Sequence, residues 1–447
     1  MTDTQVAITL IVFAAVVLAI AFDILDLALA AMLGASVLIV SGILTQEDIQ
    51  NSFKTSEGTI ALLFGGMVVA RTLAPTGIFD RVGTLLLRAT RGSGKGFLLL
   101  LIALVAPICA FLPNATTVIL VAPIIIRVAI ALGVDFVGPM VLTAIVSNSA
   151  GLLTLVGDPA TYLVGSSIGM TFTEYLRHAS LGGLLAVLII IPLLPRVMPE
   201  VWRVQREQSV DLPLEPLKRP MLCVASLTVL GLMIALFLFG EHLPTRVVPP
   251  GVAIVAAALA LLVIYSAKVE PLEKVLQDID WKTLIFLICL FWLVQAVTKT
   301  GILRELSGYF HVWFGTNLSL VGLVMLVAIG ILSSVLANTP VVVASIILIK
   351  GYLVVAQVVP EDAMGMTFTD WPVATLPLFI AMMFGATLGG NSTLIGAAAN
   401  VVSGGICAKQ GRRVSFIKFL RYGVPITLCQ LAVAALYVLA FAFLHRH

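Results

Sequence analysis

The stretch Gly389-Gly390-Asn391-Ser392-Thr393-Leu394-Ile395-Gly396 decides how the whole sequence is interpreted. It places glycines and hydrogen-bonding side chains in the middle of a long apolar segment. A second stretch of this kind, Gly151-Leu152-Leu153-Thr154-Leu155-Val156-Gly157-Asp158-Pro159, interrupts another apolar segment. In lipid, backbone groups released from a helix must be satisfied by protein, water or a solute. Paired interruptions in two halves of a chain therefore predict a transporter binding site.

The composition around these stretches is typical of a polytopic membrane protein. The 447 residues are 60% hydrophobic and 11% charged, with a mean hydropathy of +1.12, whereas soluble proteins are about 25% charged. The net charge of +3 gives no support for a nucleic-acid partner. The five cysteines form no CxxC pair, and no HExxH, Gly-x-Ser-x-Gly or P-loop motif occurs. We therefore expect no enzyme activity, no cofactor and no metal site.

Apolar runs long enough to cross a membrane recur along the chain, since one span needs about 20 apolar residues. The runs at 137–168 and 372–406 are too long for one regular crossing, and they contain the two interrupted stretches. The polar segment 199–220 is interpreted as a solvated linker. It divides the chain into a first half at 1–198 and a second half at 221–447.

The two halves match each other in sequence. A shift of 224 carries Thr76-Gly77-Ile78 onto Thr300-Gly301-Ile302, and it carries Leu112-Pro113-Asn114 onto Leu336-Ala337-Asn338. A shift of 239 carries Thr154-Leu155-Val156-Gly157 onto Thr393-Leu394-Ile395-Gly396. One ungapped match followed by a growing insertion is expected of a duplicated unit.

The placement of basic residues predicts that the two repeats are inverted. If 97–133 and 318–358 each leave and return on one side, as hairpins or as paired spans, each half makes an odd number of crossings. One side then collects 16 of the 26 basic residues, which are Arg81, Arg88, Arg91, Lys95, Arg196, Arg203, Arg206, Lys218, Arg219, Lys268, Lys274, Lys409, Arg412, Arg413, Lys418 and Arg421. The other side holds Lys54, Arg177, Arg246, Lys299, Arg304, Lys350 and Arg446. By the positive-inside rule, the linker is cytoplasmic and both termini are outside.

Four segments carry polar side chains at membrane depth. At 111–117, a proline stops the incoming helix, and the residues after it either cap the outgoing helix or present its N-terminus to a solute. The segment 333–340 repeats this arrangement, and the two opening stretches complete the set. We expect the solute to bind among Asn114, Thr116, Thr117, Asn148, Thr154, Asn338, Thr339, Asn391, Ser392, Thr393 and Asn400.

Asp158 differs from these neutral residues, because Ala397 replaces it in the second half. A carboxylate at membrane depth is costly and indicates a function. Asp158 can carry a coupling proton, accept a cation, or cap the helix that begins at Pro159. We favour the coupling proton.

At these segments the sequence resembles the ion transporter superfamily, in the branch of arsenite permeases, D-type sodium/proton antiporters and the melanosomal P protein. The stretch 388–402 resembles that branch's Leu-Gly-Gly-Asn-Gly-Thr-Leu-Ile-Gly-Ala-Ser-Ala-Asn-Val-Val. The stretch 154–159 resembles its Thr-Leu-Ile-Gly-Asp-Pro-Pro-Asn, and 112–118 resembles its Leu-Asp-Asn-Val-Thr-Thr-Val.

The resemblance implies an all-α polytopic membrane protein with two inverted repeats. It implies about ten transmembrane helices, with a re-entrant hairpin in each half, at 97–131 and 318–349, and a broken helix in each half, at 137–168 and 372–406. It also implies a homodimer in the plasma (inner) membrane and a transport domain that slides against a scaffold. A cytoplasmic ATPase subunit is a further candidate partner.

The departures from the family pattern guide the choice of solute. Pro113 stands where the family often has aspartate, Ala337 is uncharged, and Thr161 replaces an asparagine. The missing carboxylates favour a neutral solute held by amides and hydroxyls, such as the uncharged trihydroxy form of arsenite. We predict a secondary active transporter that exports arsenite or antimonite in exchange for protons by an elevator movement. The alternative is a sodium-coupled carrier, either a sodium/proton antiporter or a dicarboxylate symporter.

Overall fold

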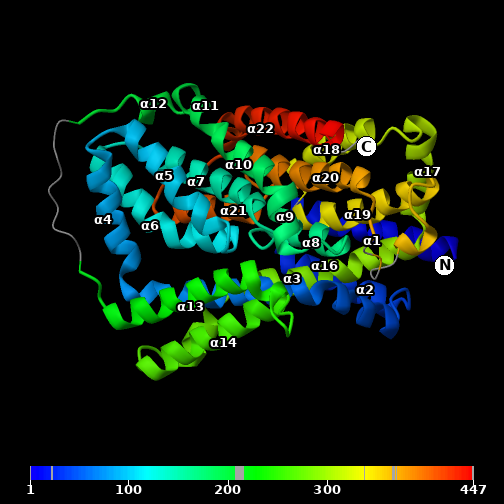
Figure 1. The fold of residues 1–447 in the computed structure, drawn as a ribbon, viewed down its shortest axis with the longest axis horizontal. Helices are drawn as coiled ribbons and strands as arrows, with labels where there is room; N and C mark the ends of the chain where they lie inside the picture. The colour runs from blue at the N-terminus through cyan, green and yellow to red at the C-terminus, as the bar shows by residue number, and fades with distance from the viewer. Residues whose placement is uncertain are drawn as a thin grey trace.

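The computed structural model describes residues 2–21, 24–206, 216–336, 338–364, 368 and 370–444, and this part of the chain is helical with no strand (Figure 1). Eleven of its helices are long and apolar enough to cross a membrane. The predicted all-α, polytopic class is therefore confirmed. Ala337, Arg446 and the middle of the predicted linker, 207–215, lie outside the described residues.

The first half contains three helices, then a helical hairpin, an interrupted helix and a further pair of helices, α10 and α11, in that chain order. Its helices are α1 (Asp3–Ala21), α2 (Leu27–Val40), α3 (Gln46–Leu73), α4 (Ile78–Thr90), α5 (Gly94–Cys109), α6 (Asn114–Leu132), α7 (Val137–Ala150), the 3₁₀ turn η2 (Gly151–Leu153), α8 (Pro159–Ser167), α9 (Phe172–His178), α10 (Ser180–Leu188), α11 (Ile190–Val197) and α12 (Pro199–Trp202).

The second half repeats this order with small differences in length. Its helices are α13 (Pro220–Phe239), α14 (Pro249–Ala267), α15 (Leu272–Gln277), α16 (Trp281–Lys299), α17 (Ile302–Phe314), α18 (Leu318–Val335), α19 (Asn338–Val355), α20 (Leu376–Gly389), the 3₁₀ turn η6 (Gly390–Ser392), α21 (Ala398–Lys409) and α22 (Phe416–Leu444).

The element bounds follow the two sequence shifts. A shift of 224 places α4 on α17, and a shift of 239 places α7 on α20 and η2 on η6, residue for residue. Gly77 and Gly301, which precede the matched helices α4 and α17, both have φ of 78°. This left-handed conformation suits glycine and allows the sharp change of direction before each amphipathic helix.

Both predicted broken helices are present. The chain leaves the helical conformation at Thr154 (φ −139°, ψ 161°) in the first and at Thr393 (φ −127°, ψ 160°) in the second. In the first, Pro159 restarts the helix at its first position, where a missing N–H costs nothing. If each broken helix counts as one crossing and each hairpin as none, the described helices make ten crossings: α1, α2, α3, α7–α8, α10–α11, α13, α14, α16, α20–α21 and α22.

Each half also packs against the other through equivalent pairs of helices. Helix α3 packs on α14 as α16 packs on α2, and α6 contacts α21 as α19 contacts α8. The hairpin α5–α6 lies with α4 toward one end of the long axis, while α17 lies at the other end with the hairpin α18–α19 beside it (Figure 1). The exact division into domains at 1–198, 199–220 and 221–447 stays a prediction.

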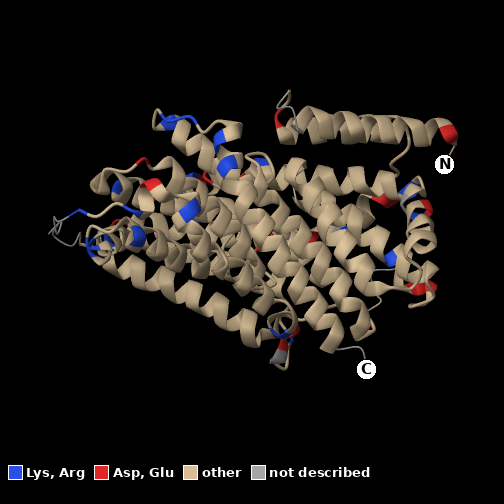
Figure 2. Ribbon diagram, turned by 90° about the horizontal axis from the view of Figure 1, so that it is seen from above, with Lys and Arg blue, Asp and Glu red and all other residues tan. Residues whose placement is uncertain are grey.

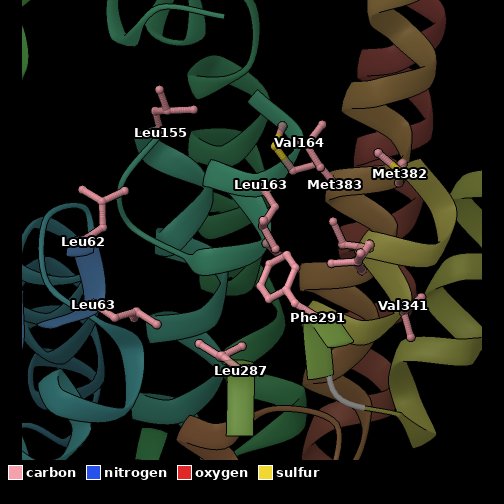
Figure 3. Close-up of a cluster of buried hydrophobic side chains, with 14 of the residues drawn as sticks. Leu62, Leu63, Leu155, Leu163, Val164, Leu287, Phe291, Val341, Met382 and Met383 are labelled. Carbon is pink, nitrogen blue, oxygen red and sulfur yellow. The ribbon is translucent and has the colours of Figure 1, made fainter. Parts of the chain in front are cut away.

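Two groups of helices meet across an apolar interface. Leu62 of α3 and Phe291 of α16 face Leu155 and Leu163, which belong to the first broken helix, and Val341 of α19 lies nearby (Figure 3). The side chains named at this interface are therefore apolar and make no directional bonds to one another. Charged residues lie elsewhere: Lys and Arg are concentrated at the end of the molecule that carries α4 (Figure 2).

Candidate functional site

Each hairpin tip lies against the break in the helix of its own half. Asn114 is the first residue of α6, and its Oδ1 atom is 3.2 Å from where a Cβ atom on Gly151 would stand. Asn338 is the first residue of α19, and the end of its side-chain amide is 2.5 Å from where a Cβ atom on Gly390 would stand. The glycines at the breaks are thus needed so that the hairpin tips can approach closely.

A threonine in each break fastens the incoming arm of the hairpin. The hydroxyl of Thr154 donates to the carbonyl of Ala110, and the hydroxyl of Thr393 donates to the carbonyl of Ser334. Ala110 and Ser334 are themselves related by the shift of 224. Both predicted threonines therefore satisfy hairpin carbonyls that have left the helical pattern.

Asp158 lies where the tip of the first hairpin meets the first break. Its Oδ1 atom accepts a hydrogen bond of 2.9 Å from Asn114 Nδ2, and its Oδ2 atom accepts one of 3.1 Å from the backbone N–H of Ala160. Asp158 therefore caps the N-terminus of α8. The Thr387 side chain of α20 faces the same carboxylate, which is only 6% exposed.

Several buried polar atoms around Asp158 lack a hydrogen-bond partner in the described structure. They are Asn114 Oδ1 and the hydroxyls of Thr117, Thr161 and Thr387. No ion pair recorded for the described residues brings a Lys or Arg to this group. Buried polar atoms are usually satisfied, so this cluster has spare capacity to bind a proton, an ion or a polar solute.

The amides at the second break form a closed network. Asn148 Nδ2 of α7 donates to Asn391 Oδ1 and to Asn400 Oδ1, both at 3.0 Å. Asn391 Nδ2 donates to Ser149 Oγ and to Gln430 Oε1 of α22, both at 2.9 Å. Asn400 Nδ2 donates to the carbonyls of Gly390 and Thr393, at 2.8 and 2.7 Å.

This network ties α7 and α22 to the second break. Each amide hydrogen on Asn148, Asn391 and Asn400 already has a protein acceptor. The predicted role of these three residues in holding a solute therefore stays a prediction. What the structure assigns to them is to hold the unwound segment in place.

The remaining predicted residues lie at the second hairpin tip or beside the first. With its amide nitrogen turned toward Ser333, Asn338 donates to Ser333 Oγ (2.7 Å) and to the carbonyl of Gly396 (3.0 Å). Ser392 donates to the carbonyl of Gly389 (2.7 Å). Thr116 and Thr339 are half-buried, and their hydroxyls form no hydrogen bond with the other described site residues. The structure brings the predicted residues to two neighbouring centres rather than one.

Three residues of these centres were missed from the sequence: Ser149, Thr387 and Gln430. Thr387 could have been found, since the shift of 239 carries Asn148 onto it. Gln430 stands in an otherwise apolar segment at 0% exposure, where a lone amide has no visible partner in the sequence. In the described residues, no group of three or more His, Cys, Asp or Glu side chains could hold a metal ion.

Comparison with known proteins shows which family this chain matches. The model of a family described as citrate transporter matches residues 12–369. An uncharacterized transporter of Synechocystis is 42% identical over 428 residues, covering 96% of this chain and 95% of that protein. An uncharacterized transporter of Mycobacterium bovis is 30% identical over 439 residues, covering 97% of each.

One further relative and one solved structure also match this chain. The human P protein is 26% identical over 513 residues, which cover 98% of this chain and 60% of the P protein. The crystal structure of the YdaH transporter of Alcanivorax borkumensis matches with a TM-score of 0.57 at 14% identity, covering 88% of this chain and 87% of that one. That structure was described as having an unusual topology, and the match supports a shared fold.

Proposed function

Because this chain belongs to the citrate transporter family, within the ion transporter superfamily, we propose that it is a proton-coupled secondary transporter of a small polar solute, with arsenite or antimonite as the first candidates. The chain is a multi-pass membrane protein, and its relatives in Synechocystis and Mycobacterium bovis are named as transporters. The coupling ion, the solute and the movement are the parts of this function that we propose.

The observation that carries the proposal is the environment of Asp158. It is a buried carboxylate without a basic partner among the described residues, and it contacts the hairpin tip through Asn114. Protonation would cancel its charge and weaken its acceptance of the Asn114 hydrogen bond. A proton would thereby change how tightly the hairpin tip is held against the break.

A neutral solute fits the polar groups near this carboxylate. Hydroxyls of Thr161 and Thr387 can donate or accept, and Asn114 Oδ1 can accept, so they match a molecule that carries several hydroxyl groups. Basic side chains would favour a solute with several negative charges, but Lys and Arg are concentrated at the molecular end near α4 (Figure 2). These features support arsenite or antimonite in their uncharged forms.

An elevator movement is supported by the interface in Figure 3. The side chains of α3 and α16 that meet the first broken helix are apolar. Sliding along such a surface breaks few directional bonds, whereas the hairpin tips and breaks are hydrogen-bonded into one unit. We propose that this unit moves and that α1–α3, α13, α14 and α16 stay fixed, in the homodimer that the family resemblance implies.

The test is flux into proteoliposomes under an imposed pH gradient. We expect arsenite or antimonite uptake driven by the gradient in the wild type, and weaker uptake in Asn114→Ala and Asn338→Ala. Asp158→Asn should remove the response to the gradient while keeping the helix cap, because asparagine also caps helices well. Glu305→Gln, an exposed acid-to-amide change on α17, is the matched control. Absence of any arsenite or antimonite flux in the wild type would sink the proposal for these solutes.

A sodium-coupled carboxylate carrier is the second candidate, and two observations favour it. The family is described as citrate transporter, and four helices begin at the two centres: α6, α8, α19 and α21. Helix N-termini carry partial positive charge and can bind an anion without a basic side chain. The same liposomes with citrate, with and without a sodium gradient, decide between the candidates, since sodium-dependent citrate uptake would favour this one.

A further inference from the structure

Two spaces at equivalent places in the two halves are filled differently. In the first half, α3, α13, the tip of the α5–α6 hairpin and the first break enclose a space of about 10 Å³. In the second half, α16, α1, the tip of the α18–α19 hairpin and the second break line one of about 260 Å³. The space in the second half is referred to below as the α1 cleft.

The two linings are related by the same shifts that relate the halves. A shift of 224 carries Leu62 onto Phe286 and Phe13 onto Phe237, and a shift of 239 carries Val156 onto Ile395. All six residues line one or the other space. In the first half, protein side chains leave almost no room, and Phe237 also stacks on Phe172 with ring centroids 5.9 Å apart. In the second half, the equivalent side chains of α1 leave a cavity.

Helix α1 lies apart from the main body in Figure 2. Only 11% of the residues in its apolar stretch, Asp3–Ile20, are buried. Its main contacts with the other helices are made to α2 and α16, and Val16 packs close to Gly34 of α2. Phe13, Val17 and Ile20 face the α1 cleft, whereas Ile11 and Leu18 are 67% and 51% exposed on the outer side. The cleft thus lies between a peripheral helix and the body of the protein.

The lining excludes water and polar solutes. Ser345 is the one polar side chain among the residues that line it. Spaces lined by apolar side chains favour apolar molecules over water, because water would find almost no hydrogen-bond partner there. Because α1, α16, α18 and α19 are all long and apolar enough to lie at membrane depth, hydrocarbon is the solvent next to the cleft.

We propose that a phospholipid acyl chain from the bilayer occupies the α1 cleft and packs against the tip of the second hairpin. The chain takes the place that protein side chains fill in the first half. Its contacts include Leu336 and Pro340 at the hairpin tip and Ile395 in the unwound segment. The lipid therefore touches the second break directly. The proposal is independent of which solute is transported.

The test is photolabelling of the full-length protein in liposomes that contain a phospholipid with a diazirine on its acyl chain. Mass spectrometry should find adducts enriched at Phe13, Val17 and Ile20 and at residues 340–348, relative to Ile11 and Leu18. Ala344→Phe, which fills the cleft from α19, should reduce labelling at Phe13 to the level of Leu18. Val327→Phe, on an exposed face of α18 (52% exposed), is the matched control and should leave the pattern unchanged.

Labelling that is equal on the inner and outer faces of α1 would overturn the proposal. So would the finding that the cleft is covered by a second copy of the chain, which cysteine crosslinking between Phe13→Cys and Ala344→Cys of different copies would reveal. If Ala344→Phe does not fold, the wild-type adduct pattern alone decides, with competition by excess unlabelled lipid as the check that the adducts reflect occupancy.

Discussion

Asn148 and Thr387 stand at equivalent positions in the two halves, and each side chain reaches the helix break of the opposite half. Asn148 donates to two amides at the second break, whereas Thr387 faces the carboxylate at the first. The repeats have thus diverged at this pair of positions. At the second break, every amide hydrogen of the asparagines is hydrogen-bonded. At the first break, several oxygens around Asp158 have no hydrogen-bond partner in the described structure.

Asn148→Ala should destabilise the protein, and Thr387→Val should not. The first change takes a donor from two buried carbonyl oxygens, and each unsatisfied buried group costs about 1–3 kcal/mol. The second removes a hydroxyl that has no hydrogen-bond partner among the described residues, so stability is kept while transport is altered. Thermal unfolding of the purified variants checks the contrast, and equal losses of stability would contradict it.

Thr154→Val and Thr393→Val should lower stability by similar amounts, about 1 kcal/mol each. Both remove a hydrogen bond to a hairpin carbonyl while keeping the shape of the side chain. Ser36→Ala is the control, because the Ser36 hydroxyl donates to Met32 on an exposed helix face. A large effect in one threonine variant and none in the other would show that the two contacts are not equivalent.

Gly389→Ala should cost about 1–3 kcal/mol through overpacking. A Cβ atom there would overlap the backbone carbonyl of Gly330 in α18, which cannot move aside as a side chain can. Gly405→Ala in α21 is the control, since a Cβ atom at that position meets nothing within 4 Å. The alanine should be neutral or favourable there because it raises helix propensity. Chemical or thermal unfolding measures the difference.

Asp48 should contribute stability that disappears in acid. Burial raises the pKa of Asp48, but hydrogen bonds from Lys299 (2.6 Å) and Thr45 outweigh it and lower the pKa to about 2. A carboxyl with a lowered pKa stabilises the fold above its unfolded pKa of 3.8, and this contribution is lost as pH falls toward 2. Asp48→Asn should therefore be less stable by about 1–2 kcal/mol at pH 7. The difference should vanish near pH 2, and a difference that is independent of pH would argue against the ion pair.

The orientation predicted from the basic residues can be tested with single cysteines. Arg412→Cys and Arg246→Cys place thiols at exposed positions on opposite predicted sides. A membrane-impermeant maleimide applied to intact cells should label position 246 and spare position 412 until the cells are lysed. Labelling of position 412 in intact cells would reverse the assignment of both termini to the outside.

The sequence by itself determined the class, the repeats and the places where the helices break. Composition required lipid as the solvent, and the two shifts located every hairpin and break, because a duplicated unit repeats its glycines and caps at fixed spacing. The threonines at positions 154 and 393 and the acid at 158 could be chosen for the same reason. Polar groups at membrane depth are rare, so each one indicates a structural or functional role.

The tertiary structure decided which polar groups satisfy one another. The sequence predicted that Asn148, Asn391 and Asn400 bind a solute, but in the structure they bond to one another and to the chain around the second break. Asn391 also bonds to Gln430, a partner that the sequence spacing does not predict. Asn114 and Asp158 are 44 residues apart and meet only because the hairpin folds back onto the break. Whether a donor finds an acceptor depends on distances between segments that are far apart in the sequence. The local sequence pattern fixes only where each donor and acceptor stands along the chain.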